Sequence, residues 1–289
     1  MKVRRVVSHD HRHRRLVVDH CKNRLSCDAG HLHSTVYCVM NVFLAGATGV
    51  VGRPSIRILL ERGHRVFAMT RHAELQHELW AAGAIPVIQD AFDAAGLTRK
   101  MKAVKPDAVI HQLTDLALLR DAGKLQEAYE RNSRLRSAGT ANLVASMVAA
   151  GVEHIVAQSI AWFYRPGPEP YREEAPLDLH APGPLGVSVE GVVALERSVL
   201  ETTGVHGCVL RYGQLYGPRT GSDDVAAEVP LHVEAAAWAS VLALEQRATG
   251  VYNVADPNRH VSTDKVRKEL GWNEALRASP RAPFAGKPR

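Results

Sequence analysis

Short apolar runs alternate with longer amphipathic stretches along residues 40–275. The runs predict buried strands, and the stretches between them, where apolar residues recur every three or four positions, predict helices. Alternation of strand and helix is typical of an α/β fold with a doubly wound parallel sheet and right-handed crossovers. The expected strands cover residues 42–45, 65–70, 85–88, 108–111, 154–158, 208–212 and 251–254.

The expected helices fill the intervals between these strands. Gly63, Gly151 and Gly271 each follow an amphipathic stretch and are good helix-ending residues. The helices after the first are expected over residues 73–82, 97–104, 125–150, 189–203 and 233–246, with a last one from 262 to 271. In a doubly wound sheet a ligand binds beyond the carboxyl ends of the strands, where the strand order reverses.

The pattern also predicts the domain organisation. We expect a nucleotide-binding domain over residues 40–217, a small C-terminal substrate-binding appendage over 218–275 and a frayed tail over 276–289. Residues 1–39 lack a sustained apolar period and are rich in Arg and His. They are expected to be a disordered or mis-assigned leader, with Met40 as the working start.

Two alternatives remain open for this leader. One is a zinc site built from its three cysteines with two histidines, although the spacing fits no common ligand pattern. The other is a transit peptide, which the Arg content favours and the acidic residues oppose. The residues of the zinc alternative are Cys21, Cys27, His31, His33 and Cys38.

Charge and cysteine content narrow the function classes. The formal net charge is +6, but residues 1–39 hold eight basic and three acidic residues, which leaves 28 basic and 27 acidic residues in the body. A nearly neutral body gives no electrostatic case for nucleic acid. No apolar run is long enough for a membrane span. Cys208 is the single cysteine of the body, so a reducing cytoplasm is expected.

The segment NVFLAGATGVVGRPSIR, residues 41–57, carries the clearest chemical signal. Gly46, Gly49 and Gly52 stand where an apolar strand gives way to a helix. Glycines there permit a tight turn, a close approach of backbone N–H groups to a pyrophosphate, and close packing of helix on strand. The helix N-terminus then favours the phosphate charge. We therefore expect a dinucleotide site that also uses Thr48, Val50 and Val51.

Two strand ends add to this site. Arg71 ends the second strand, where NAD-binding chains carry an acid for the ribose hydroxyls, and an arginine suits a 2′-phosphate. Arg53 and Thr70 are expected to assist it. NADP is therefore the expected cofactor, with NAD as the alternative. Asp90 and Ala91 follow the third strand and are expected near the adenine.

Several motifs in order resemble one family. The glycine turn is followed by Asp90-Ala91, PDAVIHQLT (106–114), GTANLVAS (139–146), HIVAQSIA (154–161), LRYGQLYGP (210–218) and GVYNVAD (250–256). This order resembles the extended short-chain dehydrogenase/reductases, the NAD-dependent epimerase/dehydratase group, from Met40 to about Trp272. The resemblance implies a homodimer through the helix over 189–203 and the long helix before it.

The resemblance also implies roles for single residues. Leu113 and Thr114 would flank the cofactor. Ser159 matches the serine that hydrogen-bonds the reacting oxygen, and Tyr212 would pass close to the nicotinamide as a substitute acid. The substrate would contact Gln214 and Tyr216.

One departure from the family bears directly on catalysis. Members normally carry Tyr-x-x-x-Lys, in which the tyrosine moves a proton and the lysine lowers the pKa of that tyrosine. Counting back from Glu196 puts the tyrosine position at Ser188 and the lysine position at Val192. Arg136 stands where the family often has Asn. His111, Tyr164 and Tyr171 are other candidate acids, but each is better explained as a structural residue.

Two functions from different classes are compatible with these residues. The first is an NADP-dependent oxidoreductase or epimerase-like enzyme acting on a small carbonyl or hydroxyl compound with atypical catalytic residues. The second is a redox-inactive NADP(H)-binding sensor or regulatory protein. Only 33 residues separate Pro218 from Tyr252, too few for the segment that holds a nucleotide-sugar in this family. We therefore expect a small-molecule substrate.

Overall fold

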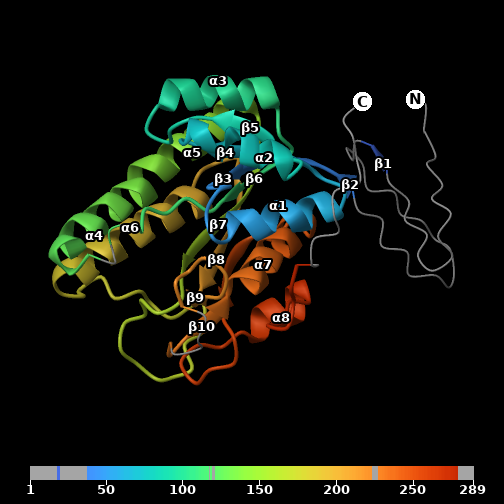
Figure 1. Cartoon of the computed structure of the whole chain (residues 1–289). Helices are drawn as coiled ribbons and strands as arrows, with labels where there is room; N and C mark the ends of the chain where they lie inside the picture. Colours follow the sequence, from blue (N-terminus) through green and yellow to red (C-terminus); the bar gives the residue numbers. More distant parts are fainter. Residues whose placement is uncertain (1–17, 20–37, 117, 119–120, 223–226, 279–289) are drawn as a thin grey trace, which may run out of the picture.

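The fold is built on a seven-stranded parallel sheet with helices on both faces (Figure 1). The computed structural model describes residues 18–19, 38–116, 118, 121–222 and 227–278. The strands are β3 (Asn41–Ala45), β4 (Arg65–Thr70), β5 (Ile85–Ile88), β6 (Ala108–His111), β7 (His154–Ile160), β8 (His206–Tyr212) and β11 (Gly250–Val254). This confirms the predicted α/β class and all seven expected strands.

The strand order is β11-β8-β7-β6-β3-β4-β5. The order reverses between β3 and β6, which are adjacent in the sheet although β4 and β5 separate them in sequence. The turn after β3 and the loop after β6 therefore leave the sheet side by side. This is the switch point at which a doubly wound sheet binds its ligand.

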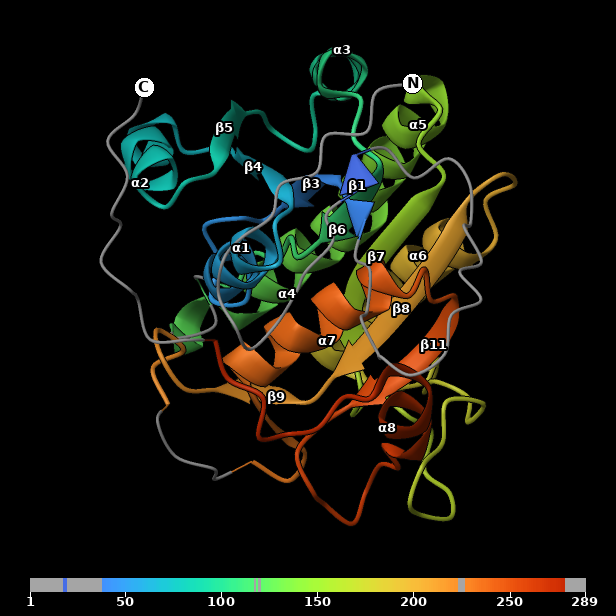
Figure 2. The same ribbon diagram turned by 90° about the vertical axis from the view of Figure 1, so that its right-hand side faces the viewer.

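Two helical layers cover the sheet (Figure 2). Helices α1 (Gly52–Glu61), α2 (Gln76–Ala81), α7 (Val233–Glu245) and α8 (Asp264–Leu270) pack on one face through a cluster that includes Val42, Leu44 and Leu210. Helices α3 (Ala94–Val104), α5 (Thr140–Ala150) and α6 (Gly183–Leu200) pack on the other through Phe43, Val109 and Val209. Because side chains alternate along a strand, successive residues feed the two cores in turn.

Helix α4 (Leu125–Arg134) and α5 form the predicted long helix, but a π-helical turn, η4 (Leu135–Gly139), separates them. Such a turn adds a residue to the local repeat and changes which side chains face inward. Helix α6 begins at Gly183, six residues before the expected start, because Pro184 is tolerated in a first helical turn.

The C-terminal region is more closely joined to the sheet than expected. Within residues 218–275, α7 and α8 pack on the main sheet and β11 forms its edge. The strand β10 (Pro230–His232) instead pairs with β9 (Gln214–Tyr216), which precedes this range, in a separate minor sheet. The first residues of the expected tail also pack: Ala278 is buried, and the Trp238 indole N–H donates to the Arg277 carbonyl.

Most of the leader lies outside the described residues, including the positions of the zinc alternative other than residue 38. Its described parts are β1 (Val18–Asp19) and β2 (Cys38–Val39), which pair in parallel. Two short 3-10 turns, η1 (Ala73–Leu75) and η3 (Ala122–Lys124), precede α2 and α4. In the described part of the chain, no helix is long and apolar enough to cross a membrane.

Candidate functional site

The glycine turn after β3 has the geometry that a dinucleotide requires. Gly46 adopts a φ of +85°, and a Cβ on it would lie 2.5 Å from the Gln112 carbonyl oxygen in the loop after β6. A Cβ on Gly52 would collide with the backbone of Gly46 and Ala47. A Cβ on Gly49 would approach the Gly46 carbonyl oxygen, at 3.3 Å, and no other atom within 4 Å. The first and third glycines thus pack the turn, and the second leaves its outer surface bare.

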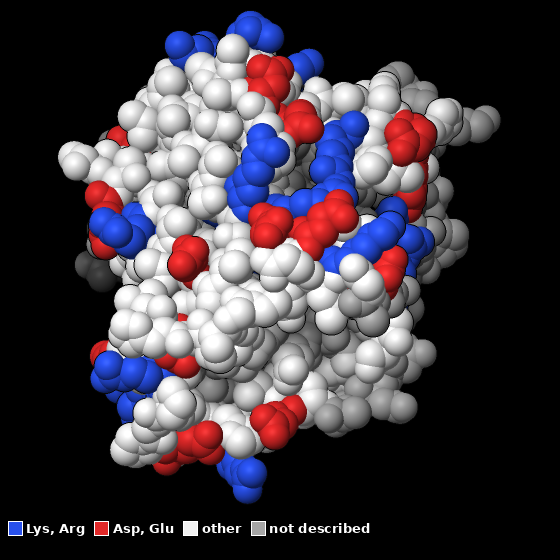
Figure 3. All heavy atoms as spheres, turned by 90° about the vertical axis from the view of Figure 1, so that its left-hand side faces the viewer, with Lys and Arg blue, Asp and Glu red and all other residues white. Residues whose placement is uncertain are grey.

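The turn opens into a pocket at the switch point. It has an empty volume of about 700 Å³, counting the space at its open mouth. The residues that line it are Gly46, Thr48, Gly49, Met69, Thr70, Arg71, His72, Gln89, Asp90, Ala91, Phe92, Gln112, Leu113, Thr114 and Leu135. Figure 3 shows the side toward which the strands point, where basic and acidic side chains surround a hollow.

Nine residues predicted for the cofactor therefore come together in one pocket: Gly46, Thr48, Gly49, Thr70, Arg71, Asp90, Ala91, Leu113 and Thr114. Val50, Val51 and Gly52 do not line it, because they form the start of α1 behind the turn. Sequence reasoning missed Gln89 and Phe92, which flank Asp90, although their place beside a strand-end aspartate was a usable signal.

The carboxylate of Asp115 pairs with two arginines, Arg71 at the pocket and Arg131 of α4. Arg71 is half-exposed, and its Nη2 lies 3.6 Å from the Asp115 carboxylate. Arg131 of α4 contacts the same oxygen at 3.1 Å. Arg53 lies elsewhere, since its Nε donates to the Thr48 carbonyl and its Nη atoms pair with Glu78. Arg71 is thus the pocket-lining arginine available to a 2′-phosphate among the described residues.

Gln112 leaves a polar atom unsatisfied beside the glycine turn. Its side-chain nitrogen donates to the Tyr212 hydroxyl at 3.2 Å, but its Oε1 is buried without a hydrogen-bond partner. A buried acceptor of this kind is stabilised only when a donor reaches it. Together with the space kept by Gly46 and Gly52, this orphaned atom fits a bound ligand at the switch point.

Ser159 does not present a free hydroxyl to the pocket. Its Oγ donates to Glu196 Oε1 at 2.7 Å, and both side chains are buried. Arg211, beside Ser159 in the sheet, donates to the same carboxylate at 2.9 and 2.7 Å. Burial alone would lower the pKa of Arg211, but the hydrogen bonds and charge of Glu196 outweigh it and raise that pKa. Ser159 thus belongs to a buried ion-pair network.

Tyr212 lies on the opposite face of the sheet from Ser159. It belongs to the core under α1 and α7, and its hydroxyl donates to the Ala236 carbonyl of α7 at 2.9 Å. Ser159 points toward α6 on the other face. Burial raises the pKa of Tyr212, which makes it a weaker acid. The structure therefore does not bring the two predicted catalytic hydroxyls together.

The structural explanation of three other candidate acids is confirmed. His111 accepts a hydrogen bond from the Leu113 N–H and pairs with Thr140 Oγ1 at 2.8 Å. Burial, with a smaller effect of the nearby Arg136 charge, lowers the pKa of His111 to about 4. Tyr164 donates to Asn253 at 2.6 Å and stacks on Tyr171, which bonds to backbone groups of Gly167.

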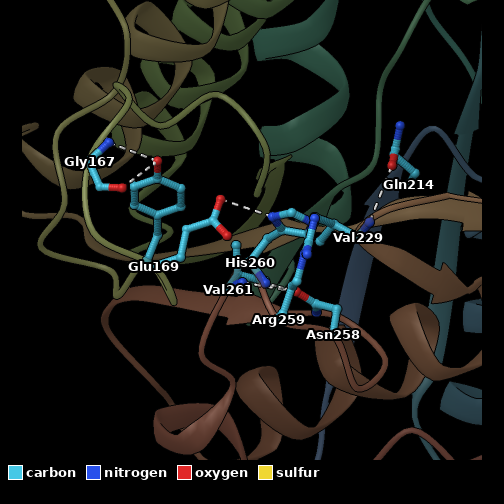
Figure 4. A network of polar contacts seen from close by, with 9 residues as sticks. Gly167, Glu169, Gln214, Val229, Asn258, Arg259, His260 and Val261 are labelled. Atoms are coloured by element: carbon cyan, nitrogen blue, oxygen red, sulfur yellow. Dashed lines mark hydrogen bonds and ion pairs between the residues drawn. The ribbon is translucent and has the colours of Figure 1, made fainter.

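The two predicted substrate residues lie in the C-terminal region. Gln214 Oε1 accepts from the Val229 N–H at 3.4 Å, and Tyr216 donates to Asp256 at 2.7 Å. Figure 4 shows Gln214 near a second network in which His260 contacts Glu169 at 2.9 Å. That network ties the loop after β7 to the loop after β11. Both predicted substrate side chains are thus engaged with their own region of the fold.

Comparison with known proteins fixes the family. The model of the NAD dependent epimerase/dehydratase family matches residues 42–244, which is most of the chain. A Streptomyces protein named 3-diazoavenalumate denitrifying reductase is 42% identical over 238 residues, covering 75% of this chain and 76% of that protein. The chain belongs to the NAD-dependent epimerase/dehydratase family. The resemblance seen in the sequence is thereby confirmed.

Solved structures of this epimerase/dehydratase fold superpose on most of the chain. A Thermotoga maritima UDP-glucose 4-epimerase with UDP-glucose has a TM-score of 0.66 at 19% identity, covering 82% of this chain and 94% of its own. The Bordetella bronchiseptica enzyme WbmG in complex with NAD has a TM-score of 0.64 at 20% identity, covering 82% and 90%. At these identities the likeness shows the fold alone. Family and named relative together support an NAD(P)-dependent oxidoreductase or epimerase.

Helix α6 carries the two residues, Ser188 and Val192, that the sequence count predicts for the family's proton-transfer pair. Ser188, Val192 and Glu196 are four residues apart and share one helix face. Ser188 Oγ accepts from Arg136 Nη1 at 3.3 Å. Val192 is buried in an apolar cluster with Ile160. The two positions that the sequence count predicts for the family's tyrosine and lysine thus hold a hydroxyl bonded to Arg136 and a buried apolar side chain.

Proposed function

We propose that this chain is an NADPH-dependent reductase that replaces the diazo group of a small aromatic compound by hydrogen. The observation that carries the proposal is the environment of Ser188 and Val192, which offers no acid at the positions where the family moves a proton. The support for the substrate class is the printed name of the Streptomyces relative, a denitrifying reductase of a diazo compound, at 42% identity.

The residues of the switch point fit the pyridine dinucleotide that this reaction uses. Gly46 and Gly52 keep space that a Cβ would fill, and the first turn of α1 follows directly. Asp90 Oδ1 accepts from the Phe92 N–H at 2.8 Å, which fixes its carboxylate at the pocket wall. Gln112 and Leu113 approach the turn from β6. These residues would hold the dinucleotide with its phosphates on the helix N-terminus.

The chemistry of a diazo acceptor removes the need for a proton donor. When bound, the reduced nicotinamide supplies a hydride, and a hydride that replaces the N₂ of an arene diazonium gives the arene and N₂ with charge and atoms balanced. Reduction of a carbonyl needs a proton for the oxygen as well, which the family obtains from its tyrosine. Serine cannot supply that proton near neutral pH, and valine carries none. The loss of the acid–base pair is thus compatible with a reductase of this kind.

The protein's own residues then have a limited task. Val192, one helical turn from Ser188, belongs to a buried apolar cluster with Ile160, and apolar surroundings of this kind would keep water away from a reactive electrophile. Arg136 keeps positive charge at Ser188, to whose Oγ it donates at 3.3 Å. The residues bind and orient the substrate, and orientation alone is a large source of rate enhancement.

The test is turnover of 3-diazoavenalumate, the compound in the relative's name, with NADPH. We expect stoichiometric loss of NADPH absorbance and release of N₂ at a rate well above that of heat-denatured protein. A panel of aldehydes and ketones should give at least about 100-fold lower kcat/KM, because no tyrosine is present to protonate their oxygen. Equal activity on the carbonyl panel would contradict the proposal. Saturable NADPH binding without any turnover would replace it with the redox-inactive sensor.

The proposal includes a preference for NADP over NAD, which rests on Arg71. Arg71→Glu should weaken NADP by roughly 10- to 100-fold and change NAD little, because a guanidinium–phosphate contact is exchanged for repulsion. The measurement is calorimetric titration with both nucleotides. Arg197→Glu is the matched control, because Arg197 is exposed on α6, away from the pocket, and pairs with Glu201 at 3.4 Å. Equal weakening of both nucleotides by Arg71→Glu would refute the preference.

A further inference from the structure

Arg136 is a buried cation that has no anionic partner among the residues the structure describes. Its side chain projects from the π-helical turn between α4 and α5, and it is 5% exposed. Its Nη1 donates a hydrogen bond to Ser188 Oγ at 3.3 Å. Among the described residues, no carboxylate lies within ion-pair distance of it. A buried arginine in this condition is unusual, because buried charges are normally paired.

Arg211 supplies an internal comparison. It is 6% exposed, much the same as Arg136, yet it forms two hydrogen bonds to the Glu196 carboxylate at 2.9 and 2.7 Å. The pKa of Arg211 is raised by its partner, whereas burial lowers the pKa of Arg136 to about 10. Arg136 still carries its charge near neutral pH. Among the described residues, Arg211 therefore has a carboxylate partner and Arg136 has none.

The open charge lies beside the proposed reaction site. It affects His111, the last residue of β6, and the loop that follows β6 lines the cofactor pocket. Leu135, the residue before Arg136, lines the same pocket. The π turn that carries both residues is a type of distortion found frequently at functional sites. Arg136 thus directly follows a residue of the cofactor pocket and lies close enough to the end of β6 for its charge to act on His111.

The surroundings of Arg136 suggest what such a molecule looks like. Ser188 uses its oxygen to accept from Arg136, so its hydroxyl proton remains available to a second acceptor. One helical turn along α6, Val192 joins an apolar cluster with Ile160 and Phe163. A guanidinium with a hydroxyl beside it can bind a carboxylate through charge-assisted hydrogen bonds. The apolar side chains nearby can contact a hydrocarbon or aromatic part of the same ligand.

We propose that Arg136 binds the carboxylate of a small aromatic acid substrate, with Ser188 donating a second hydrogen bond to it. The placement beside the cofactor rests on the proposed function. The recognition itself is a property of this guanidinium. Binding of the acid would complete the missing ion pair, so the substrate's charge takes the part that Glu196 takes for Arg211. Selection would then favour acids over neutral molecules of the same shape.

The test compares 4-coumarate with 4-coumaramide, which differ in charge at one group and carry no diazo function. Titration calorimetry of the NADP-saturated protein should show the acid binding at least about 10-fold more tightly than the amide. Arg136→Gln should remove that difference, and Arg136→Lys should retain part of it. Arg197→Gln, an exposed arginine on α6, should leave it unchanged. A preference for the acid that survives Arg136→Gln, or no preference in the unaltered protein, would overturn the proposal.

A second readout separates ligand binding from a structural role. Removing an unpaired buried charge should leave the melting temperature of the Arg136→Gln protein unchanged or higher, because nothing in the fold loses an ionic partner. A marked fall in melting temperature in both the Gln and Lys variants would show a structural arginine and contradict the proposal. Because the two ligands are unreactive, failure of the diazo reaction would leave the result on Arg136 standing, and failure of the acid preference would leave the reaction standing.

Discussion

Gly46→Ala is expected to abolish binding of pyridine nucleotides. The φ of +85° at this position is unfavourable for any residue with a Cβ, and the added carbon would lie 2.5 to 2.9 Å from three backbone atoms of Gln112 and Leu113. Backbone atoms cannot rotate away as a side chain does, so the turn and the loop after β6 must separate. We expect at least about a 100-fold loss of NADP affinity and about 3 kcal/mol of lost stability.

Gly63→Ala is the matched control for this substitution. Gly63 has nearly the same φ, +88°, but a Cβ there has nothing within 4 Å. It should cost about 1–2 kcal/mol through backbone strain alone and leave nucleotide affinity intact. Calorimetric titration and thermal unfolding of both variants measure the two effects. Similar nucleotide affinity in the two variants would show that the turn after β3 does not hold the dinucleotide.

Glu196→Ala is expected to destabilise the fold by about 3–5 kcal/mol. The substitution leaves the buried Arg211 guanidinium without its carboxylate and the Ser159 hydroxyl without its acceptor. Glu201→Ala removes an exposed partner of Arg197 on the same helix and should change stability by no more than about 0.5 kcal/mol. Chemical denaturation of both proteins gives the comparison. A decrease in the free energy of unfolding below about 1 kcal/mol for Glu196→Ala would mean that this network contributes little to the stability of the fold.

Much of the fold could be predicted from the sequence because apolar runs mark buried parallel strands. All seven main strands follow from that pattern, as do the glycines that end α1, α5 and α8. The π turn over Leu135–Gly139 could not be predicted, because it leaves the apolar pattern of a continuous helix almost unchanged. The start of α6 was missed because Gly183 and Pro184 are typical of a loop, although they form the first turn of the helix after the extended Pro182.

The cofactor side of the site was predictable for a similar reason. Strand ends in a doubly wound sheet converge, so Gly46, Arg71 and Asp90 had to share one edge. The catalytic side of the site could not be predicted, because the face on which each side chain lies depends on the register between strands. Ser159 pairs with Arg211, and Tyr212 is one residue further along. A shift of one residue moves a side chain to the other face, and single-sequence patterns do not fix that register between strands far apart in the chain.

The burial of Arg136 also depends on how distant parts of the chain pack together, so the sequence does not predict it. On an uninterrupted helix its side chain would be one of several on a mixed face, and nothing in the sequence marks it as buried. The π turn and the contact with Ser188 become apparent only when α4 and α6 are packed together. The unpaired charge is therefore a feature that only the three-dimensional arrangement shows.

In the proposed reaction, a hydride passes from NADPH to an acceptor that needs no proton donor. The most direct measurement is a reaction of 3-diazoavenalumate with NADPH deuterated at the transferring C4 position, carried out in ordinary water and analysed by mass spectrometry and proton NMR. The account predicts one deuterium in the product, on the ring carbon that lost N₂. A product without deuterium at that carbon, formed at the same rate in the absence of NADPH, would contradict it.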